Sequence, residues 1–200
     1  MKIAIFDYGA GNLHSLAKAL ARTGHEIVVE TDPRRAIDSD MLVLPGVGAF
    51  SAAAERLAPV LEDVRAALAG GLPAIGVCLG MQLLFDASEE GGGAGIGLIP
   101  GRVTKLRAPR VPHIGWNSVE PVAAAEPALA RTLLDTAYFA HSYVCRPVDP
   151  AVVTAWTSEG GDRFPAAVRV GRTVGVQFHP EKSSAAGVEL LEALVAEAFR

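Results

Sequence analysis

The sequence has few of the features that mark secreted, membrane-spanning or nucleic-acid-binding proteins. Its 200 residues contain only two cysteines, too few for a disulfide framework and typical of a reducing compartment. No apolar run reaches the length of a membrane span, and the first residues meet Asp7 too soon for a signal peptide. A formal net charge of −4 gives no reason to expect nucleic acid or a membrane as partner. We therefore expect a cytoplasmic protein.

The order of predicted elements indicates one α/β domain spanning residues 1–200, because no repeat, low-complexity tail or linker interrupts it. Strand-like segments cover residues 2–7, 26–30, 40–44 and 73–77, and helical patterns cover 13–21 and 51–69, the second broken at Pro59. Such alternation predicts a parallel sheet with helices on both faces. Later β-like runs, at 102–106, 138–145, 151–157, 166–170 and 173–178, predict a more antiparallel portion of the sheet. A helix over 184–199 follows.

The most informative segment is the run GVCLGMQ at residues 76–82, which follows a predicted strand and precedes a helix-like segment, 82–85. A nucleophile flanked by glycines at a strand-to-helix corner is typical of a nucleophile elbow. The N–H groups that begin the helix favour a thiolate at Cys78 and an oxyanion beside it. A buried structural cysteine is the alternative that this segment alone leaves open.

A nucleophilic cysteine needs a base, and His179 is the best candidate among the five histidines. It ends a strand-like run and is followed by Pro180 and Glu181. In an extended segment residues i and i+2 project to the same side, so Glu181 can orient the imidazole. A strand-end histidine with an incidental acid remains the alternative on spacing alone.

Two backbone N–H groups are the candidates for an oxyanion hole. The first belongs to Leu79, directly after the nucleophile. The second lies in the run PGVG at residues 45–48, whose glycines permit close approach and peptide reorientation. An ordinary strand-to-helix turn is the alternative for this run.

The runs GVCLGMQ, PGVG and QFHPE (residues 177–181) together resemble the class I, triad-type glutamine amidotransferases. The resemblance covers essentially the whole chain. It implies a three-layer, flavodoxin-like α/β fold with a mainly parallel central sheet, helices on both faces and an antiparallel extension. It also implies that Cys78 attacks L-glutamine, with His179 as base and Glu181 orienting it, and that no metal or other cofactor takes part.

Further segments resemble the glutaminase subunits of imidazole glycerol phosphate synthases, which act in histidine biosynthesis. They are FDYGAGN (6–12), VPHIGWN (111–117), YFAHSY (138–143) and KS (182–183). The resemblance implies a heterodimer in which a (β/α)8 cyclase subunit receives the ammonia. That subunit uses it to form imidazole glycerol phosphate and an aminoimidazole carboxamide ribotide.

The resemblance assigns roles to residues in three groups. The oxyanion would be held by the N–H groups of Val47 and Leu79. Glutamine would be bound by Gly46, Gly48, Gln82, His141, Ser142 and Tyr143. The partner would meet Tyr8, Asn12, Trp116, Asn117 and Lys182. For Gln82 a helix-capping role, for His141 a core position, and for the partner-side residues solvated surface or local packing remain alternatives.

Three other functions compete with this interpretation. The chain could be the glutaminase component of another synthase, such as anthranilate synthase, with the same chemistry and a different partner; the segments at 8–12, 113–117 and 181–183 argue against it. A non-catalytic regulatory or scaffold subunit would commonly lack the nucleophile or base, both of which are present. A cysteine peptidase or esterase is disfavoured by the glutamine-holding segments.

Overall fold

An eight-stranded sheet organises the computed structural model, which describes residues 1–9, 13–122, 126–132 and 134–200. Its strands lie in the order β2-β1-β3-β4-β13-β12-β11-β8. The parallel part consists of β1 (Lys2–Phe6), β2 (Glu26–Glu30), β3 (Met41–Leu44), β4 (Ala74–Val77) and β13 (Thr173–Val176). The antiparallel extension consists of β12 (Asp162–Val170), β11 (Val153–Glu159) and β8 (Glu120–Pro121). The predicted α/β class, with its parallel sheet and antiparallel extension, is confirmed.

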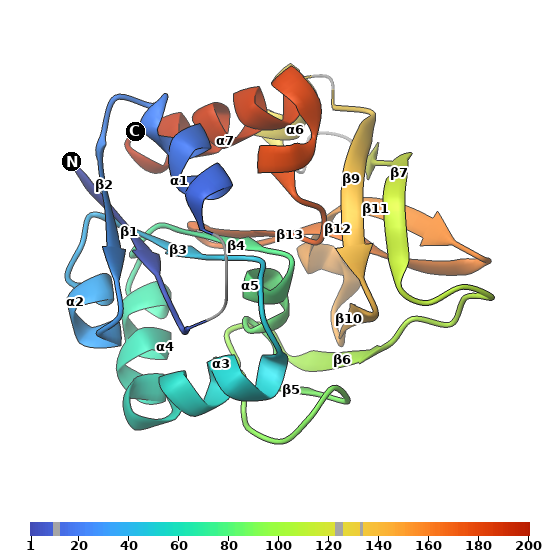
Figure 1. Cartoon of the computed structure of the whole chain (residues 1–200), viewed down its shortest axis with the longest axis horizontal. Helices are drawn as coiled ribbons and strands as arrows, with labels where there is room; N and C mark the ends of the chain where they lie inside the picture. Colours follow the sequence, from blue (N-terminus) through green and yellow to red (C-terminus); the bar gives the residue numbers. More distant parts are fainter. Residues whose placement is uncertain (10–12, 123–125, 133) are drawn as a thin grey trace.

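Apart from the edge strand β2, the parallel strands are buried on both faces because helices cover both faces of the sheet. Side chains alternate, so Ile3 and Ile5 of β1 enter one core while Ala4 and Phe6 enter the other. The first core lies under α1 (His14–Ala21), α6 (Pro127–Thr132) and α7 (Ser184–Ala198). The second lies under α2 (Pro33–Ile37), α3 (Phe50–Leu57), α4 (Leu61–Ala69) and α5 (Leu79–Gln82). Figure 1 shows these two helical layers above and below the sheet.

Two smaller sheets stand beside the central one, at the right of Figure 1. One pairs β7 (His113–Ser118) with β9 (Thr136–His141), and the other has the order β10-β6-β5. Its strands are β5 (Ala87–Ser88), β6 (Gly101–Lys105) and β10 (Tyr143–Pro147). Three-residue 3-10 turns, η1 (Ala58–Val60), η2 (Pro150–Val152) and η3 (Pro180–Lys182), complete the chain.

The small sheets correct one expectation, that the runs at 102–106 and 138–145 would extend the central sheet. The run 138–145 is two strands that break at Ser142 and pair with different partners. The carbonyl of Ser142 accepts from the Leu106 N–H at 2.9 Å, next to the Tyr143–Lys105 pair of the β10–β6 ladder. The β7–β9 pairing ends at His141 and the pairing with β6 starts directly afterwards, so the two halves of the run belong to different sheets.

The helical predictions hold with shifted boundaries. Residues 51–69 form α3 and α4, separated by η1 around Pro59 as its ring requires. The helix after the elbow begins at Leu79, directly behind Cys78, and not at Gln82. None of the described helices is long and apolar enough to cross a membrane.

Candidate active site

Cys78 occupies a sharp corner between β4 and α5, at the carboxyl ends of the parallel strands. Its backbone has φ 47° and ψ −103°, a conformation that L residues adopt rarely and that clusters at functional sites. The corner closes because Gly76 and Gly80 carry no side chain. A Cβ on Gly80 would lie 2.0 Å from the Leu44 carbonyl oxygen, and one on Gly76 would lie 2.6 Å from the Gly80 oxygen. The glycines predicted to permit an elbow are therefore required by its packing.

His179 and Glu181 form a hydrogen-bonded pair beside Cys78. His179 Nδ1 donates to Glu181 Oε1 at 2.9 Å, and the two side chains are only 4% and 7% exposed. Burial opposes a charged imidazole, but hydrogen bonds with Cys78 and Glu181 outweigh it and raise the pKa of His179 to about 9. His179 is therefore an imidazolium at neutral pH, held between Cys78 and Glu181. The three residues that the sequence predicts as a triad lie together.

The turn over residues 45–48 lies directly against this triad. A Cβ on Gly46 would come within 3.0 Å of both Cys78 Cβ and His179 Cε1, so only glycine fits there without displacing one of them. The Tyr8 hydroxyl donates to the Pro45 carbonyl. Tyr8, predicted on the partner side, is 4% exposed and is held inward against this turn.

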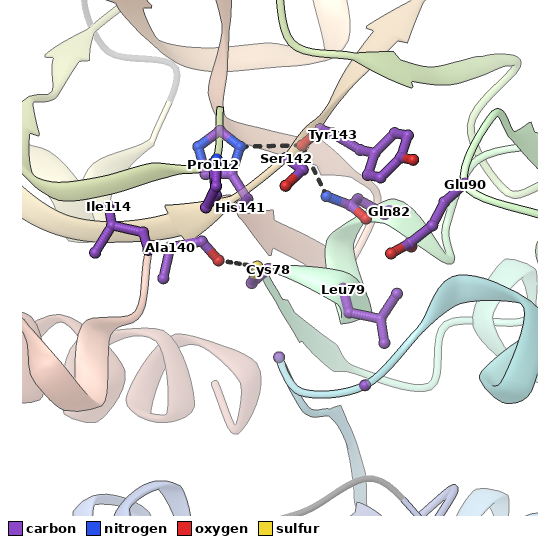
Figure 2. A pocket seen from close by; sticks show the side chains of 12 residues that line it. Cys78, Leu79, Gln82, Glu90, Pro112, Ile114, Ala140, His141, Ser142 and Tyr143 are labelled. Atoms are coloured by element: carbon purple, nitrogen blue, oxygen red, sulfur yellow. Dashed lines mark hydrogen bonds between the residues drawn. The ribbon is translucent and has the colours of Figure 1, made fainter. Parts of the chain in front are cut away.

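A cavity of about 290 Å³ opens in front of Cys78 (Figure 2). All six residues predicted to bind glutamine line it, together with Leu79: they are Gly46, Gly48, Gln82, His141, Ser142 and Tyr143. Val47 does not line the cavity itself, although both its neighbours do. Leu79, the first residue of α5, has no carbonyl four residues back within the helix for its N–H.

Hydrogen bonds fix the polar wall of the cavity. Gln82 Nε2 donates to the Tyr143 carbonyl at 3.0 Å and to Gln177 Oε1 at 3.3 Å. Both of its amide hydrogens are therefore used, and only its oxygen is left to accept from a ligand. Figure 2 shows the nitrogen turned towards Tyr143 and the oxygen turned away.

His141 is a neutral, fully bonded histidine in the same wall. Its Nδ1 donates to the Tyr143 carbonyl at 3.0 Å, and its Nε2 lies 3.3 Å from His113 Nδ1. Since a carbonyl can only accept, Nδ1 carries the proton and Nε2 accepts from His113. Burial, with the charges of His113 and His179, lowers the pKa of His141 to about 3 despite the Tyr143 bond. His141 therefore shapes the wall, and its ring nitrogens are not available for a ligand.

Glu90 is a cavity residue that sequence reasoning missed. Its side chain lines the cavity, and Oε2 accepts from the Phe50 N–H, at the start of α3, at 3.0 Å. In the sequence Glu90 stands beside Glu89 and before a glycine-rich loop, a context typical of solvated acids. Its place in the cavity depends on the fold, which brings the loop to α3.

The residues predicted to meet a partner differ in exposure. Trp116 is 56% exposed on β7, beside Ile114 at 63%, and Lys182 is exposed as well. Asn117 is half-buried and donates to the Ser158 carbonyl at 2.9 Å. Asn12 lies outside the described residues. Ile114 and Trp116 are two residues apart on β7, so their exposed apolar side chains project from the same face of the strand and form a strip there.

Among the residues that the structure describes, no three His, Cys, Asp or Glu side chains converge as a metal site would require. The cavity has the size of an amino acid, and its lining combines the Cys78 thiol with polar groups of Gln82, Glu90, His141, Ser142 and Tyr143.

The sequence model described as "Glutamine amidotransferase class-I" matches residues 4–198. The chain therefore belongs to the class I glutamine amidotransferase family. Solved structures agree on the fold. A structure titled "Crystal structure of glutamine amidotransferase" superposes with a TM-score of 0.74 at 18% identity, covering 99% of both chains. "Structure of PurLQS from Thermotoga maritima" has a TM-score of 0.72 at 17% identity, covering 98% of both.

More similar relatives narrow the family to the type named "Imidazole glycerol phosphate synthase subunit HisH". The relative from Corynebacterium diphtheriae is 45% identical, over 95% of this chain and 96% of its own length. The one from Sulfolobus acidocaldarius is 43% identical over 96% of both. The one from Acaryochloris marina is 41% identical over 94% of this chain and 91% of its own length.

Proposed function

We propose that this chain, as a single domain over residues 1–200, is the glutaminase subunit of a cytoplasmic imidazole glycerol phosphate synthase. It hydrolyses L-glutamine to glutamate and ammonia, and a cyclase subunit consumes the ammonia. The observation that carries the proposal is the Cys78–His179–Glu181 cluster, whose cysteine lines an amino-acid-sized cavity. The HisH-type relatives support the choice of synthase.

In the first step the Cys78 thiolate attacks the side-chain amide carbon of glutamine. The carbon–nitrogen bond breaks as the His179 imidazolium gives its proton to the leaving nitrogen, so ammonia departs and a glutamyl thioester remains. Glu181 holds Nδ1, which leaves Nε2 to face the sulfur and the leaving group. The raised pKa of His179, about 9, keeps this proton available at neutral pH.

In the second step neutral His179 removes a proton from water, whose oxygen attacks the thioester carbon. The carbon–sulfur bond breaks, glutamate leaves, and the thiolate–imidazolium pair is restored. Both steps build charge on the carbonyl oxygen, which the N–H groups of Leu79 and Val47 would stabilise. Because Val47 does not line the cavity, we propose that the turn over 45–48 reorients when the enzyme is activated.

Acceptor groups in the cavity suit the α-amino end of glutamine. Glu90 contributes a carboxylate, and Gln82 has only its amide oxygen unused. An ammonium group donates hydrogen bonds and carries a positive charge, so it complements both. Backbone groups of Gly48, Ser142 and Tyr143 border the rest of the cavity and would meet the carboxylate end.

Replacing Glu90 by Gln is expected to raise KM for glutamine by about 10- to 100-fold, the range for one hydrogen bond to a charged group. The amide oxygen can still accept from the Phe50 N–H, so α3 keeps its start and kcat changes little. Steady-state kinetics of the complex measure both constants. The matched control is Glu89→Gln, because the Glu89 carboxylate is exposed and accepts from the Lys105 N–H. An unchanged KM for Glu90→Gln would contradict the assignment of Glu90 to the α-amino end of glutamine.

The synthase requires a partner, which we propose to be a (β/α)8 cyclase subunit that docks on the side of Trp116, Asn117 and Lys182. The exposed strip of Ile114 and Trp116 offers apolar contact area there. Tyr8 is buried, so we propose that it acts on this interface through the turn it holds. Confining ammonia between subunits keeps it unprotonated and nucleophilic.

A glutamine-dependent cyclisation assay with the cyclase and its nucleotide substrate tests the proposal. We expect slow glutamine hydrolysis by the chain alone and a faster rate when both are added. Product formation from ammonia but not from glutamine would contradict the proposed function. Activity with the other anthranilate synthase component instead would favour the competing synthase.

A further inference from the structure

Gln177, which is not a member of the triad, also contacts the Cys78 nucleophile. Gln177 follows Val176, the last residue of β13. The Cys78 N–H donates to the Val176 carbonyl at 2.7 Å. The two residues therefore lie next to each other at the ends of adjacent parallel strands. Gln177 is 0% exposed, and its Nε2 lies 3.5 Å from Cys78 Sγ.

The direction of this contact follows from a chain of hydrogen bonds. The Tyr143 carbonyl can only accept, so the Gln82 atom facing it must be Nε2. That nitrogen also faces Gln177, so the Gln177 atom that meets it must be an acceptor, Oε1. The amide nitrogen of Gln177 is then left to point at the sulfur, as a donor. A backbone carbonyl thereby sets the orientation of both amides.

We propose that Gln177 is a second hydrogen-bond donor to the Cys78 sulfur, which stabilises the thiolate and holds it in line with the cavity. The inference rests on the proposed glutaminase activity, whose nucleophile is this sulfur. His179 moves its Nε2 proton between the sulfur, the leaving nitrogen and the attacking water, so its hydrogen bond to the sulfur is made and broken within each turnover. Gln177 cannot ionise, so its donor stays with the sulfur before attack and when the thioester breaks.

Several titratable groups face the sulfur, and each has to be kept constant when Gln177 is changed. Electrostatic interactions with Cys78 are found for His179, Tyr8 and Cys145. Glu181 and His141 lie next to His179. None of these side chains is bonded to Gln177 in the hydrogen bonds described above, so its substitution leaves their own partners in place.

The test compares Gln177→Met, which keeps the side-chain length but has no amide, with Gln177→Glu, which keeps an acceptor for Gln82. Thr173→Val is the matched control. It lies on β13, the strand that leads to Gln177, is also buried, and its hydroxyl has no partner among the described residues. Each variant is assayed for glutamine hydrolysis in the complex with the cyclase. Iodoacetamide alkylation of Cys78 is followed against pH in a Cys145→Ala background.

For Gln177→Met we expect kcat to fall by about 10- to 100-fold, as for one hydrogen bond to a charged group, with a smaller change in KM. The alkylation profile shifts to higher pH. Gln177→Glu loses at least as much, because a carboxylate beside the sulfur repels the thiolate. Thr173→Val keeps the kcat and the alkylation profile of the unaltered chain.

An unchanged kcat and alkylation profile for Gln177→Met overturns the inference, and so does a rise in KM alone, which would mean that Gln177 serves only Gln82. If Gln177→Met does not fold, Gln177→Glu decides: full kcat in that variant overturns the inference. Failure of the proposed function is distinguishable, because the unaltered complex would then hydrolyse no glutamine.

Discussion

Cys78→Ala is expected to abolish glutamine hydrolysis, with a loss of at least about 10⁴-fold in kcat, because no other group can form the thioester. Ammonia-dependent cyclisation by the complex is expected to continue, since the cyclase chemistry does not use this sulfur. The small alanine side chain fits the corner between Gly76 and Gly80. Glutamine- and ammonia-dependent product formation are measured on the same preparation.

Cys145→Ala is the control for this experiment. Cys145 is free and fully buried on β10, and burial, with the nearby Cys78, raises the pKa of its thiol well above the usual value. It therefore stays an inert packing group, and its substitution leaves kcat unchanged. Residual glutamine hydrolysis by Cys78→Ala, or its loss in Cys145→Ala alone, would contradict the assignment of the nucleophile.

His179→Ala is expected to lower kcat by about 10²- to 10⁴-fold, the contribution of a positioned general acid–base. The variant can neither hold the thiolate nor protonate the leaving nitrogen. It also cannot activate water for the second step. His25→Ala is the control, because His25 packs against the Phe199 ring and is not part of the triad. A His179 variant with most of its activity would leave the reaction without a base and contradict the mechanism.

The pH profile gives a second readout for His179. Its raised pKa of about 9 means that the imidazolium exists at neutral pH and is lost as pH rises through that value. The rate is therefore expected to fall on the alkaline side near pH 9. In Glu181→Gln a neutral amide replaces the carboxylate that stabilises the imidazolium, so the fall moves to lower pH. An alkaline limb unaffected by Glu181→Gln would exclude the proposed role of that carboxylate.

The architecture was predictable from the sequence where a pattern is local. Continuous apolar segments predict the buried parallel strands, and Pro59 predicts the break between α3 and α4. The sequence did not predict β7, because its exposed face carries the apolar Ile114 and Trp116 with Gly115 between them. The alternation of buried apolar and exposed polar residues that marks a strand is therefore absent. The split at Ser142 was missed because it depends on which strands each half pairs with, and that is a property of the assembled fold.

The candidate site divides in the same way. Cys78, His179 and Glu181 are predictable from short segments: glycines flank Cys78 at a strand-to-helix corner, and His179 and Glu181 are spaced to lie on the same side of an extended chain. Glu90 and Gln177 are not, because a loop acid and a strand-end amide gain their positions only when distant segments meet. Val47 is a third kind of case, since its proposed oxyanion role requires a rearrangement of the turn.

The most direct test of the mechanism is mass spectrometry of the chain, quenched in acid while the complex turns over glutamine. We expect one glutamyl group attached to Cys78, and none in Cys78→Ala. Fragmentation of the labelled peptide locates the group. Glutamine turnover with the group on another residue, or with no covalent adduct under any quench condition, would contradict a thioester mechanism at Cys78.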